Sequence, residues 1–198
     1  MEFNRRAFLG SVVIGAAALG VSPTAASVIG QRSPNLLAKA RAALARHRAH
    51  ITHTDVIAIA DFTLASRQPR FHLIDIASGQ TTSLLVAHGR GSDPANIGFV
   101  ERFSNQPGSY ATSNGSYVTG DAYIGKHGRS RRLIGLDPEN DQALPRAIVI
   151  HAAPYVTHEM AKTQGRVGRS QGCFTVTQID LEMVLERLGP GRLLFADK

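Results

Sequence analysis

The chain contains no tryptophan and only one cysteine, Cys173, and the shortage of cysteine restricts what the protein can be. One cysteine cannot form an internal disulfide. Basic residues are not interleaved with aromatic ones as in proteins that bind single-stranded nucleic acid, so we expect no nucleic-acid partner. The sequence also lacks internal repeats and low-complexity tracts. These absences favour a single folded domain.

The composition favours a fold rich in β-strands. Hydrophobic residues make up 43% of the chain and charged residues 19%, which is ordinary for a globular protein. The 19 glycines and 9 prolines indicate many turns and short elements rather than a helical bundle. The formal net charge of +7 predicts attraction to anionic surfaces, among them cell-wall polymers and lipid headgroups.

The N-terminal residues 1–26 are typical of a twin-arginine export signal. Arg5 and Arg6 stand before an apolar run over 11–21, and small residues offer a cleavage point near Ala26. The run is short for a membrane span, so we expect membrane contact only through this leader, if it stays uncleaved. The prediction is an exported protein of the periplasm or cell envelope.

Export makes the lone thiol informative, because oxidising compartments normally hold cysteines in pairs. An exported chain with an odd cysteine either pairs with another chain or uses the thiol in chemistry. No cysteine stands at the end of the leader, so lipid attachment there is not expected.

Hydrophobic patterning divides the remaining chain into a helical lead-in over 27–54 and one β-rich domain over 55–198. Apolar residues at helical spacing follow Ser33-Pro34, which favours a short amphipathic helix. Strands are expected over 55–64, 71–76, 81–88, 147–150 and 192–195, the first three adjacent in a sheet.

The connections carry their own signals. Residues 89–109 are rich in Gly, Asn, Ser, Asp and Pro, which predicts a long loop. Asn114-Gly115 predicts a tight hairpin turn between strands over 110–112 and 117–119. A short helix is expected after Thr177, where a capping-box pattern begins, and it should stop at Gly189.

Cys173 lies in the segment 168–174, Gly-Arg-Ser-Gln-Gly-Cys-Phe. Gly172 supplies backbone freedom rather than a packing wall, so the thiol is expected to be presented, although a small buried hydrophobe is the alternative. His151 ends an apolar strand, and a returning loop would bring it within hydrogen-bond distance of Cys173. A nearby imidazolium would lower the pKa of the thiol and make it a nucleophile. His158 is an alternative base.

The loop before Cys173 also suits the stabilisation of an oxyanion. With Gly172 beside the nucleophile, backbone N–H groups can be aimed at a developing negative charge. Each such donor contributes about 3 kcal/mol to catalysis.

Several segments resemble one family in the same order along the chain. They are 60–62, 86–93, 103–105, 123–128, 135–136, 146–151 and the loop around Cys173. Over about 55–196 the chain resembles the exported L,D-transpeptidases with a YkuD-like catalytic domain. In particular it resembles the branch whose nucleophile loop reads Gly-Arg-Ser-x-Gly-Cys.

The resemblance implies a mainly β, β-rich α+β fold, a single sandwich or barrel domain with a short helix after the cysteine loop. It also implies His151 as general base, Cys173 as nucleophile, and Ser170 and Gly172 as oxyanion and nucleophile-loop residues. Candidate substrate contacts are Arg169, as a cation near a substrate carboxylate, and three residues in matching segments, His88, Tyr123 and His127. The chain departs from the wider family at Gln171, where histidine is common, and at Thr175, where arginine or asparagine is common.

The reaction that the resemblance implies is acyl transfer on peptidoglycan stem peptides through a Cys173 thioester, which carbapenems should also form. An amine of a second stem, or of a protein to be tethered to the wall, would resolve the thioester. With water as acceptor the chain would be an L,D-carboxypeptidase or endopeptidase. Two competing functions are a sortase-like transpeptidase and a non-catalytic wall-binding module.

No metal or cofactor is expected. His47, His50 and His53 recur every three residues, but no acidic or thiol ligand accompanies them, so a solvated helix end is the simpler interpretation.

Overall fold

The computed structural model describes residues 34–198, so the export signal expected over 1–26 lies outside the described residues. The helices are α2 (Pro34–Arg46), α3 (His158–Thr163) and α4 (Leu181–Arg187), with a 3-10 turn η1 (Arg90–Ser92). The strands are β1 (Val56–Asp61), β2 (Phe71–Asp75), β3 (Thr81–Leu84), β4 (Gly115–Gly125), β5 (Gly128–Gly135), β6 (Val149–Ala152), β7 (Phe174–Val176) and β8 (Leu193–Asp197). Within the described part, none of the helices combines the length and apolarity needed to cross a membrane.

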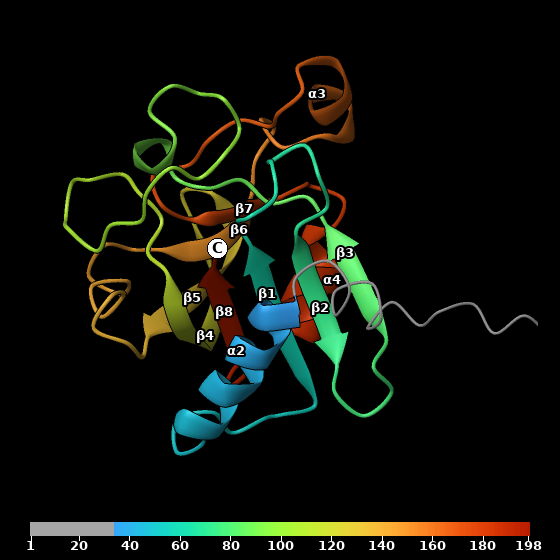
Figure 1. Ribbon diagram of the computed structural model, residues 1–198, viewed down its shortest axis with the longest axis vertical. Coiled ribbons are helices and arrows are strands. Elements are labelled where there is room, and N and C mark those ends of the chain that lie inside the picture. Colours follow the sequence, from blue (N-terminus) through green and yellow to red (C-terminus); the bar gives the residue numbers. More distant parts are fainter. Residues whose placement is uncertain (1–33) are drawn as a thin grey trace, which may run out of the picture.

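All eight strands form one mixed sheet in the order β3-β2-β1-β8-β4-β5-β6-β7. The last strand, β8, lies in its middle, parallel to β1 and antiparallel to β4 (Figure 1). The two edges of the sheet meet, because the amide of Ala87, just after β3, donates a 2.8 Å hydrogen bond to the carbonyl of Thr175 in β7. The predicted mainly β, α+β domain of sandwich or barrel form is therefore confirmed, as a single curled sheet.

The main hydrophobic core fills the inside of this curl. Ala58 and Ala60 of β1 belong to it, together with Tyr117 and Phe174. The Phe174 ring is fully buried and makes an edge-to-face contact with Tyr117, the ring centroids being 5.4 Å apart. Since Phe174 follows Cys173 directly, the backbone next to the cysteine is anchored in the core.

Helix α2 covers the outer face of the sheet (Figure 1). Ile57 and Ile59 alternate with the inward residues of β1 and pack against a second core that includes Leu36, Ala40 and Ala43 of α2. The three helical residues are spaced by four and three positions, so they share one face. The expected amphipathic helix is confirmed.

The expected hairpin turn at Asn114-Gly115 is wrong. Gly115 begins β4, and the chain turns instead at Lys126-His127, between β4 and β5. The glycine serves a close approach: its φ is +105°, and a Cβ there would lie 2.8 Å from a carboxylate oxygen of Asp137. An Asn-Gly pair can therefore occur where close packing requires a glycine, and does not by itself establish a tight turn.

Strand β7 was not expected from the sequence, and it sets the position of the cysteine. It is parallel to β6, and the connection between them carries α3, whose N-cap Thr157 accepts a hydrogen bond from the amide of Met160. Helix α4 follows β7 as expected, and the amide of Asp180 donates to the hydroxyl of Thr177 at 3.2 Å. Cys173 therefore lies directly before the first residue of a sheet strand.

Candidate active site

The pairing of β6 with β7 brings the two predicted catalytic residues to one place. His151 is the Cα partner of Thr175, Cys173 directly precedes the paired residues of β7, and the amide of Val149 in β6 interacts with Cys173. Side chains alternate along strands, so these four residues project from one face of the sheet. Both Cys173 and His151 line a single cleft of about 610 Å³.

The walls of the cleft come from four parts of the chain that are distant in sequence. They are the loop around residues 107–110, the β4–β5 hairpin, the segment 145–155 with β6, and the loop 169–173. The charged side chains among the lining residues are Lys126, Arg146 and Arg169, and in the described part of the chain no aspartate or glutamate lines the cleft. The cleft is therefore suited to a negatively charged ligand.

The loop before the cysteine is held by Ser170. Its hydroxyl donates to the carbonyl of Cys173 at 2.7 Å and accepts from the amide of Gly172 at 3.1 Å. The φ of Gly172 is +118°, and a Cβ there would lie 2.8 Å from the carbonyl oxygen of Ala111. Gly172 is thus required by the shape of the loop, and its amide is already used within it.

The thiol of Cys173 is less exposed than the sequence suggested. The residue is 9% exposed, and its Sγ lies 3.6 Å from the carbonyl of Ala147, toward which it donates. Burial raises the pKa of the Cys173 thiol, and the amide of Val149 and the charges of Lys126 and Arg146 only partly oppose this. The expectation of a presented thiol with a lowered pKa is therefore wrong for this resting structure.

His151 is buried and held at both ring nitrogens. Nδ1 lies 2.9 Å from the carbonyl of Ala152, which can only accept, so Nδ1 carries the proton. Nε2 is then the basic atom, and the hydroxyl of Thr175 lies 3.1 Å from it. Burial lowers the pKa of His151, and the nearby His127 and Lys126 lower it further. The imidazole is a neutral base at pH 7.

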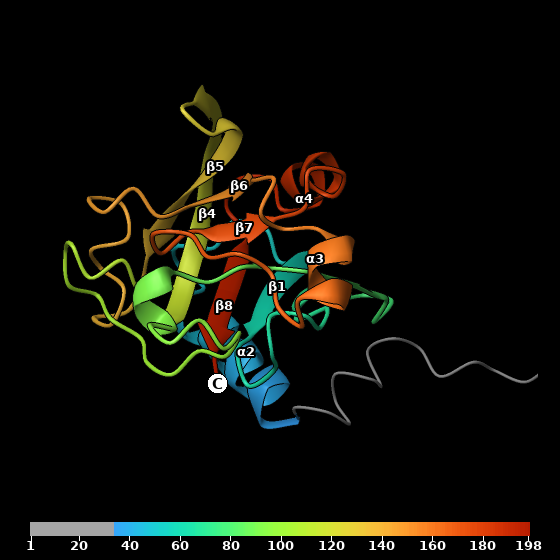
Figure 2. The ribbon, with the colours of Figure 1, turned by 90° about the horizontal axis from the view of Figure 1, so that it is seen from above.

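The β4–β5 hairpin projects from the body of the protein (Figure 2). Lys126 and His127 at its tip line the cleft. There the ring of His127 stacks on that of His151, with centroids 4.3 Å apart and planes at 22°. Tyr123 also lines the cleft, and the guanidinium of Arg132 lies over its ring, 4.3 Å from the centroid. Two of the predicted substrate contacts, Tyr123 and His127, are therefore at the cleft.

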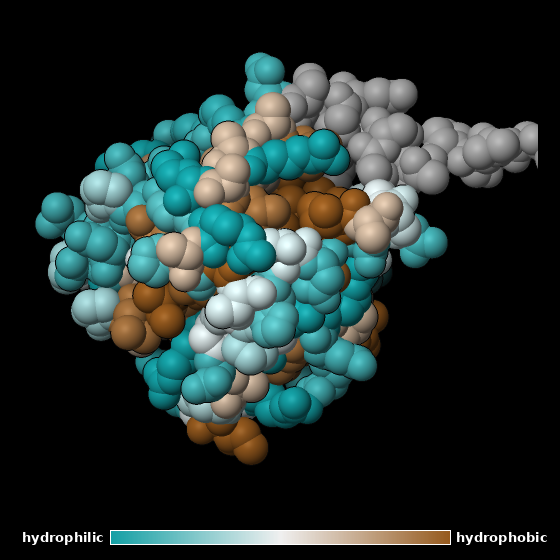
Figure 3. Space-filling model, turned by 90° about the horizontal axis from the view of Figure 1, so that it is seen from below, coloured by the Kyte–Doolittle hydropathy of each residue, from teal (hydrophilic) through white to brown (hydrophobic). Residues whose placement is uncertain are grey.

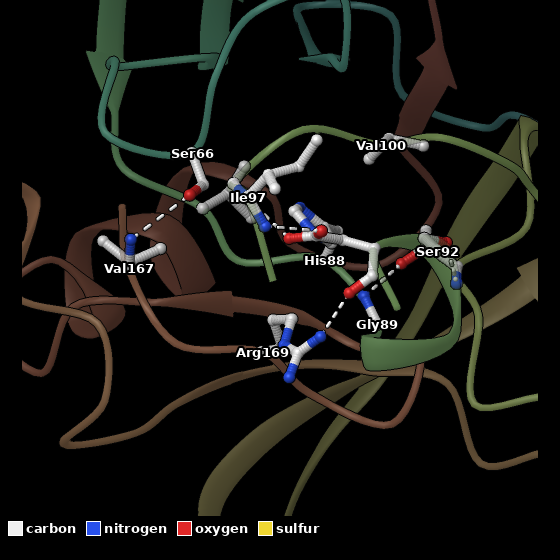
Figure 4. Close-up of polar contacts among 12 residues, drawn as sticks. Ser66, His88, Gly89, Ser92, Ile97, Val100, Val167 and Arg169 are labelled. Carbon is white, nitrogen blue, oxygen red and sulfur yellow. Dashed lines mark hydrogen bonds and ion pairs between the residues drawn. The ribbon is translucent and has the colours of Figure 1, made fainter. Parts of the chain in front are cut away.

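The other two predicted contacts, Arg169 and His88, lie near one another (Figure 4), but only Arg169 lines the cleft. Arg169 lines the cleft, and its guanidinium donates to the main-chain carbonyl of Asp93. His88 is fully buried outside the cleft, between Arg70 and Asp93, and burial together with Arg70 lowers its pKa to about 3. His88 therefore belongs to the internal support of the loops and has no access to a ligand in the cleft.

Arg146 also lines the cleft, and the sequence analysis gave it no role of its own; Tyr155 lines the cleft as well. Arg146 donates to the carbonyls of Ala111 and Ser104, at 2.5 and 2.8 Å, and so fixes the loop opposite Cys173. Tyr155 places its hydroxyl 3.3 Å from that of Thr175. The position of Arg146, just before a buried strand that ends in the candidate base, was the available signal for it.

The remaining histidine candidates lie elsewhere. His158 is exposed at the start of α3 and does not line the cleft. His47 is bonded to the carboxylate of Asp137 at 2.8 Å instead of being solvated. Among residues 34–198, no group of three or more His, Cys, Asp or Glu side chains is arranged to hold a metal ion.

The model of the L,D-transpeptidase catalytic domain family matches residues 30–196. A search of curated proteins gives no significant match.

Solved structures with a similar chain path include three bacterial proteins. An L,D-transpeptidase from Mycobacterium smegmatis is 12% identical, with a TM-score of 0.44 over 73% of this chain and 59% of that one. An L,D-transpeptidase from Mycobacterium tuberculosis H37Rv is 15% identical, with a TM-score of 0.41 over 73% and 58%. The helical cell shape determining protein Pgp2 from Campylobacter jejuni is 11% identical, with a TM-score of 0.49 over 75% and 48%. This chain thus spans about half to three fifths of their lengths.

Proposed function

The chain belongs to the L,D-transpeptidase catalytic-domain family, and from this premise we propose that it is an exported cysteine acyltransferase that acts on peptidoglycan stem peptides. The observation that carries the proposal is that Cys173, directly before β7, and His151, in the parallel neighbour β6, line one cleft. A thiol beside a neutral imidazole is the minimum equipment for nucleophilic acyl transfer.

Acylation begins from a neutral pair, because burial raises the pKa of the thiol and lowers that of the imidazole. As Sγ of Cys173 bonds to the carbonyl carbon of the third stem residue, the thiol proton passes to Nε2 of His151 and the carbonyl electrons move to oxygen. Collapse of this intermediate breaks the peptide C–N bond. The imidazolium gives its proton to the departing amine of the terminal D-alanine, leaving a thioester.

Transfer to the acceptor runs the same steps in reverse order. An amine of a second stem, or of a wall-tethered protein, attacks the thioester carbonyl and loses a proton to His151. The thiolate of Cys173 then leaves and is reprotonated by the imidazolium. Water in place of the amine makes the same cleft a hydrolase.

The charges of the cleft support this chemistry. Lys126 and Arg146 oppose the burial cost of a charged Cys173, and no lining carboxylate works against them in the described residues. A positive field also favours the oxyanion that develops at the substrate carbonyl. Arg169, Tyr123 and His127 are proposed contacts of the stem, the first for a carboxylate.

The proposed location is the periplasm or cell envelope. Its support is the paired-arginine leader over 1–26. Cell-wall stems occur in the same place, so location and chemistry are mutually consistent.

Intact-mass analysis after exposure to a carbapenem tests the proposal. We expect an adduct of one carbapenem on the wild-type chain and none on Cys173→Ala. Cys173→Ala should also fail to release D-alanine from muropeptides. An unmodified wild-type chain, or a Cys173→Ala chain that still releases D-alanine, would contradict the proposal, the former in favour of a wall-binding module with a buried, inert thiol.

The products of the same incubation identify the acceptor. Purified stems give crosslinked dimers when an amine resolves the thioester, and only shortened stems when water does. Addition of a candidate wall-tethered protein tests the third acceptor, by its gain of a stem in mass.

A further inference from the structure

The basic atom of His151 is bonded to a hydroxyl that has a second hydroxyl behind it. Thr175 Oγ1 lies 3.1 Å from Nε2, and Tyr155 Oη lies 3.3 Å from Thr175 Oγ1. The other nitrogen, Nδ1, is occupied by the carbonyl of Ala152. In the resting protein the imidazole therefore has no free nitrogen for a thiol proton.

The directions of these hydrogen bonds follow from the carbonyl. Because Ala152 can only accept, Nδ1 donates and Nε2 must accept, so the Thr175 hydroxyl donates to Nε2. The oxygen of Thr175 is then left as an acceptor for the hydroxyl of Tyr155. The resting chain of donors runs from Tyr155 through Thr175 to His151.

The same two hydroxyls can also serve His151 after it has taken a proton. Nε2–H is then a donor, and Thr175 Oγ1 can accept it if the threonine hydroxyl turns toward Tyr155 Oη. A hydroxyl both donates and accepts, so this reversal needs rotation of two O–H bonds and no movement of heavy atoms. Valine or phenylalanine, the nearest apolar equivalents, offers neither state.

We propose that Thr175 and Tyr155 are positioning residues that hold His151 in both its neutral and its protonated form, with the threonine hydroxyl turning toward Tyr155 to release Nε2 for the thiol proton. This inference rests on the proposed function for the step that it serves. The hydrogen-bond arrangement itself is independent of it.

Burial shows why hydroxyls are significant here. Thr175 is fully buried in β7, between Phe174 and Val176. An apolar side chain at this position would need no hydrogen-bond partner, whereas a hydroxyl does. Burial of a hydroxyl without a hydrogen-bond partner is unfavourable, so Thr175 is stable there because it is bonded. Burial also raises the pKa of Tyr155, which keeps its hydroxyl protonated and able to donate at neutral pH.

A pair of substitutions at Thr175 separates the hydroxyl from the side-chain shape. Thr175→Val keeps the β-branched shape, and Thr175→Ser keeps the hydroxyl. For Thr175→Val we expect carbapenem acylation of Cys173 to slow by roughly fivefold to tenfold, the loss of one hydrogen bond in the transition state. Thr175→Ser should stay within about twofold of wild type, and Tyr155→Phe should fall between the two.

The ¹⁵N resonance of Nε2 of His151, measured in the full-length, ligand-free protein, distinguishes a hydrogen bond to His151 from a purely structural role of Thr175. Thr175→Val should shift it to the position of an imidazole nitrogen without a hydrogen bond, and Thr175→Ser should not. Thr175→Val should also lower the pKa of His151, because its protonated form loses an acceptor. The titratable groups that act on the ring, His127 and Lys126, are unchanged in this variant, and so are Tyr155 and Cys173, which line the same cleft.

An unchanged Nε2 resonance in Thr175→Val, or equal losses of acylation rate in Thr175→Val and Thr175→Ser, overturns the inference. Failure of the proposed function is a separate result, because a wild-type chain that forms no carbapenem adduct still reports the hydrogen bond by its ¹⁵N resonance.

Discussion

At the scale of single residues, the two reactive groups of the cleft are kept neutral by burial. Ion pairing between a thiolate and an imidazolium would need a low thiol pKa and a high imidazole pKa, and both shifts have the opposite sign here. Cys173 donates to Ala147, and His151 is bonded to Thr175 and Ala152. The thiol of Cys173 is therefore activated only as it attacks the substrate carbonyl, when its proton passes to His151.

Alkylation of Cys173 measures this directly. Because thiolate is the reacting form, iodoacetamide should modify the folded protein slowly at pH 7, and the rate should rise only above about pH 8.5, the ordinary pKa of cysteine. The control is the same chain unfolded in urea, in which the rate should rise near pH 8.5. A fast reaction at pH 7 that decreases below pH 6 would show an ion pair instead.

His88 gives a second prediction, for stability. Its pKa is about 3 in the folded protein, lowered from 6.5 by burial and then by Arg70. Between these values the unfolded chain binds a proton that the folded chain does not, so the free energy of unfolding falls as the pH falls from 6.5 toward 3. The loss attributable to His88 is on the order of 2–4 kcal/mol.

Urea unfolding of His88→Gln across this pH range tests the assignment. The variant should be less stable at pH 7 by roughly 1–3 kcal/mol, because Arg70 and Asp93 lose part of their partner, but its stability should depend less on pH. His50→Gln, at an exposed position, is the control and should follow the wild type. Equal pH dependence in wild type and His88→Gln would contradict the assignment.

At the scale of elements, the sequence predicted those parts of the site that depend on local patterns. The strand before His151, the glycine beside Cys173 and the helix after Thr177 all follow from residues close in sequence. The β4–β5 hairpin did not, because Asn114-Gly115 is a stronger local turn signal than Lys126-His127. The glycine at 115 is explained only by Asp137, which a local pattern does not include.

Strand β7, which directly follows Cys173, illustrates the same limit of local patterns. β7 is three residues long, and its pairing partners are β6 and the carbonyl and amide groups around Ala87. Such a strand has no periodicity of its own and forms because the curled sheet supplies its partners. The Thr175 contacts with His151 and Tyr155 depend on this pairing, so no sequence pattern could have indicated them.

The hairpin tip makes a prediction about the base. In His127→Ala the stacked ring that shields and opposes a charge on His151 is gone, so the pKa of His151 should rise toward its ordinary value. The acid limb of the pH profile for carbapenem acylation should move to higher pH by roughly half a unit. The control is Arg41→Ala, on α2, for which the limb should stay in place. An unmoved limb in His127→Ala would show that the stack does not affect the base.

At the scale of the whole molecule, the protein is basic, and its cleft is lined by cations where the proposed anionic substrate would bind. The chain carries 22 lysines and arginines against 15 aspartates and glutamates. On the face in Figure 3, hydrophobic residues are exposed in patches that hydrophilic residues separate. The cleft combines this overall charge with a lining that holds three cationic side chains and, among the described residues, no carboxylate. Long-range attraction should therefore assist the binding of anionic stems.

The dependence on salt tests this attraction. Raising the ionic strength from about 0.1 M to about 1 M shortens the Debye length from about 10 Å to about 3 Å, so KM for an anionic muropeptide should rise by roughly threefold to tenfold. The value of kcat should change by less than about twofold, because the buried groups are poorly screened. Lys126→Gln, which removes a cation from the cleft, should have a higher KM at low salt and a weaker salt dependence. Arg41→Gln lowers the net charge equally but changes a helix on the outer face, so it should keep the wild-type dependence. A KM that does not respond to salt would contradict the attraction, and an equal effect of the two substitutions would show that the substrate responds to overall charge rather than to the cleft.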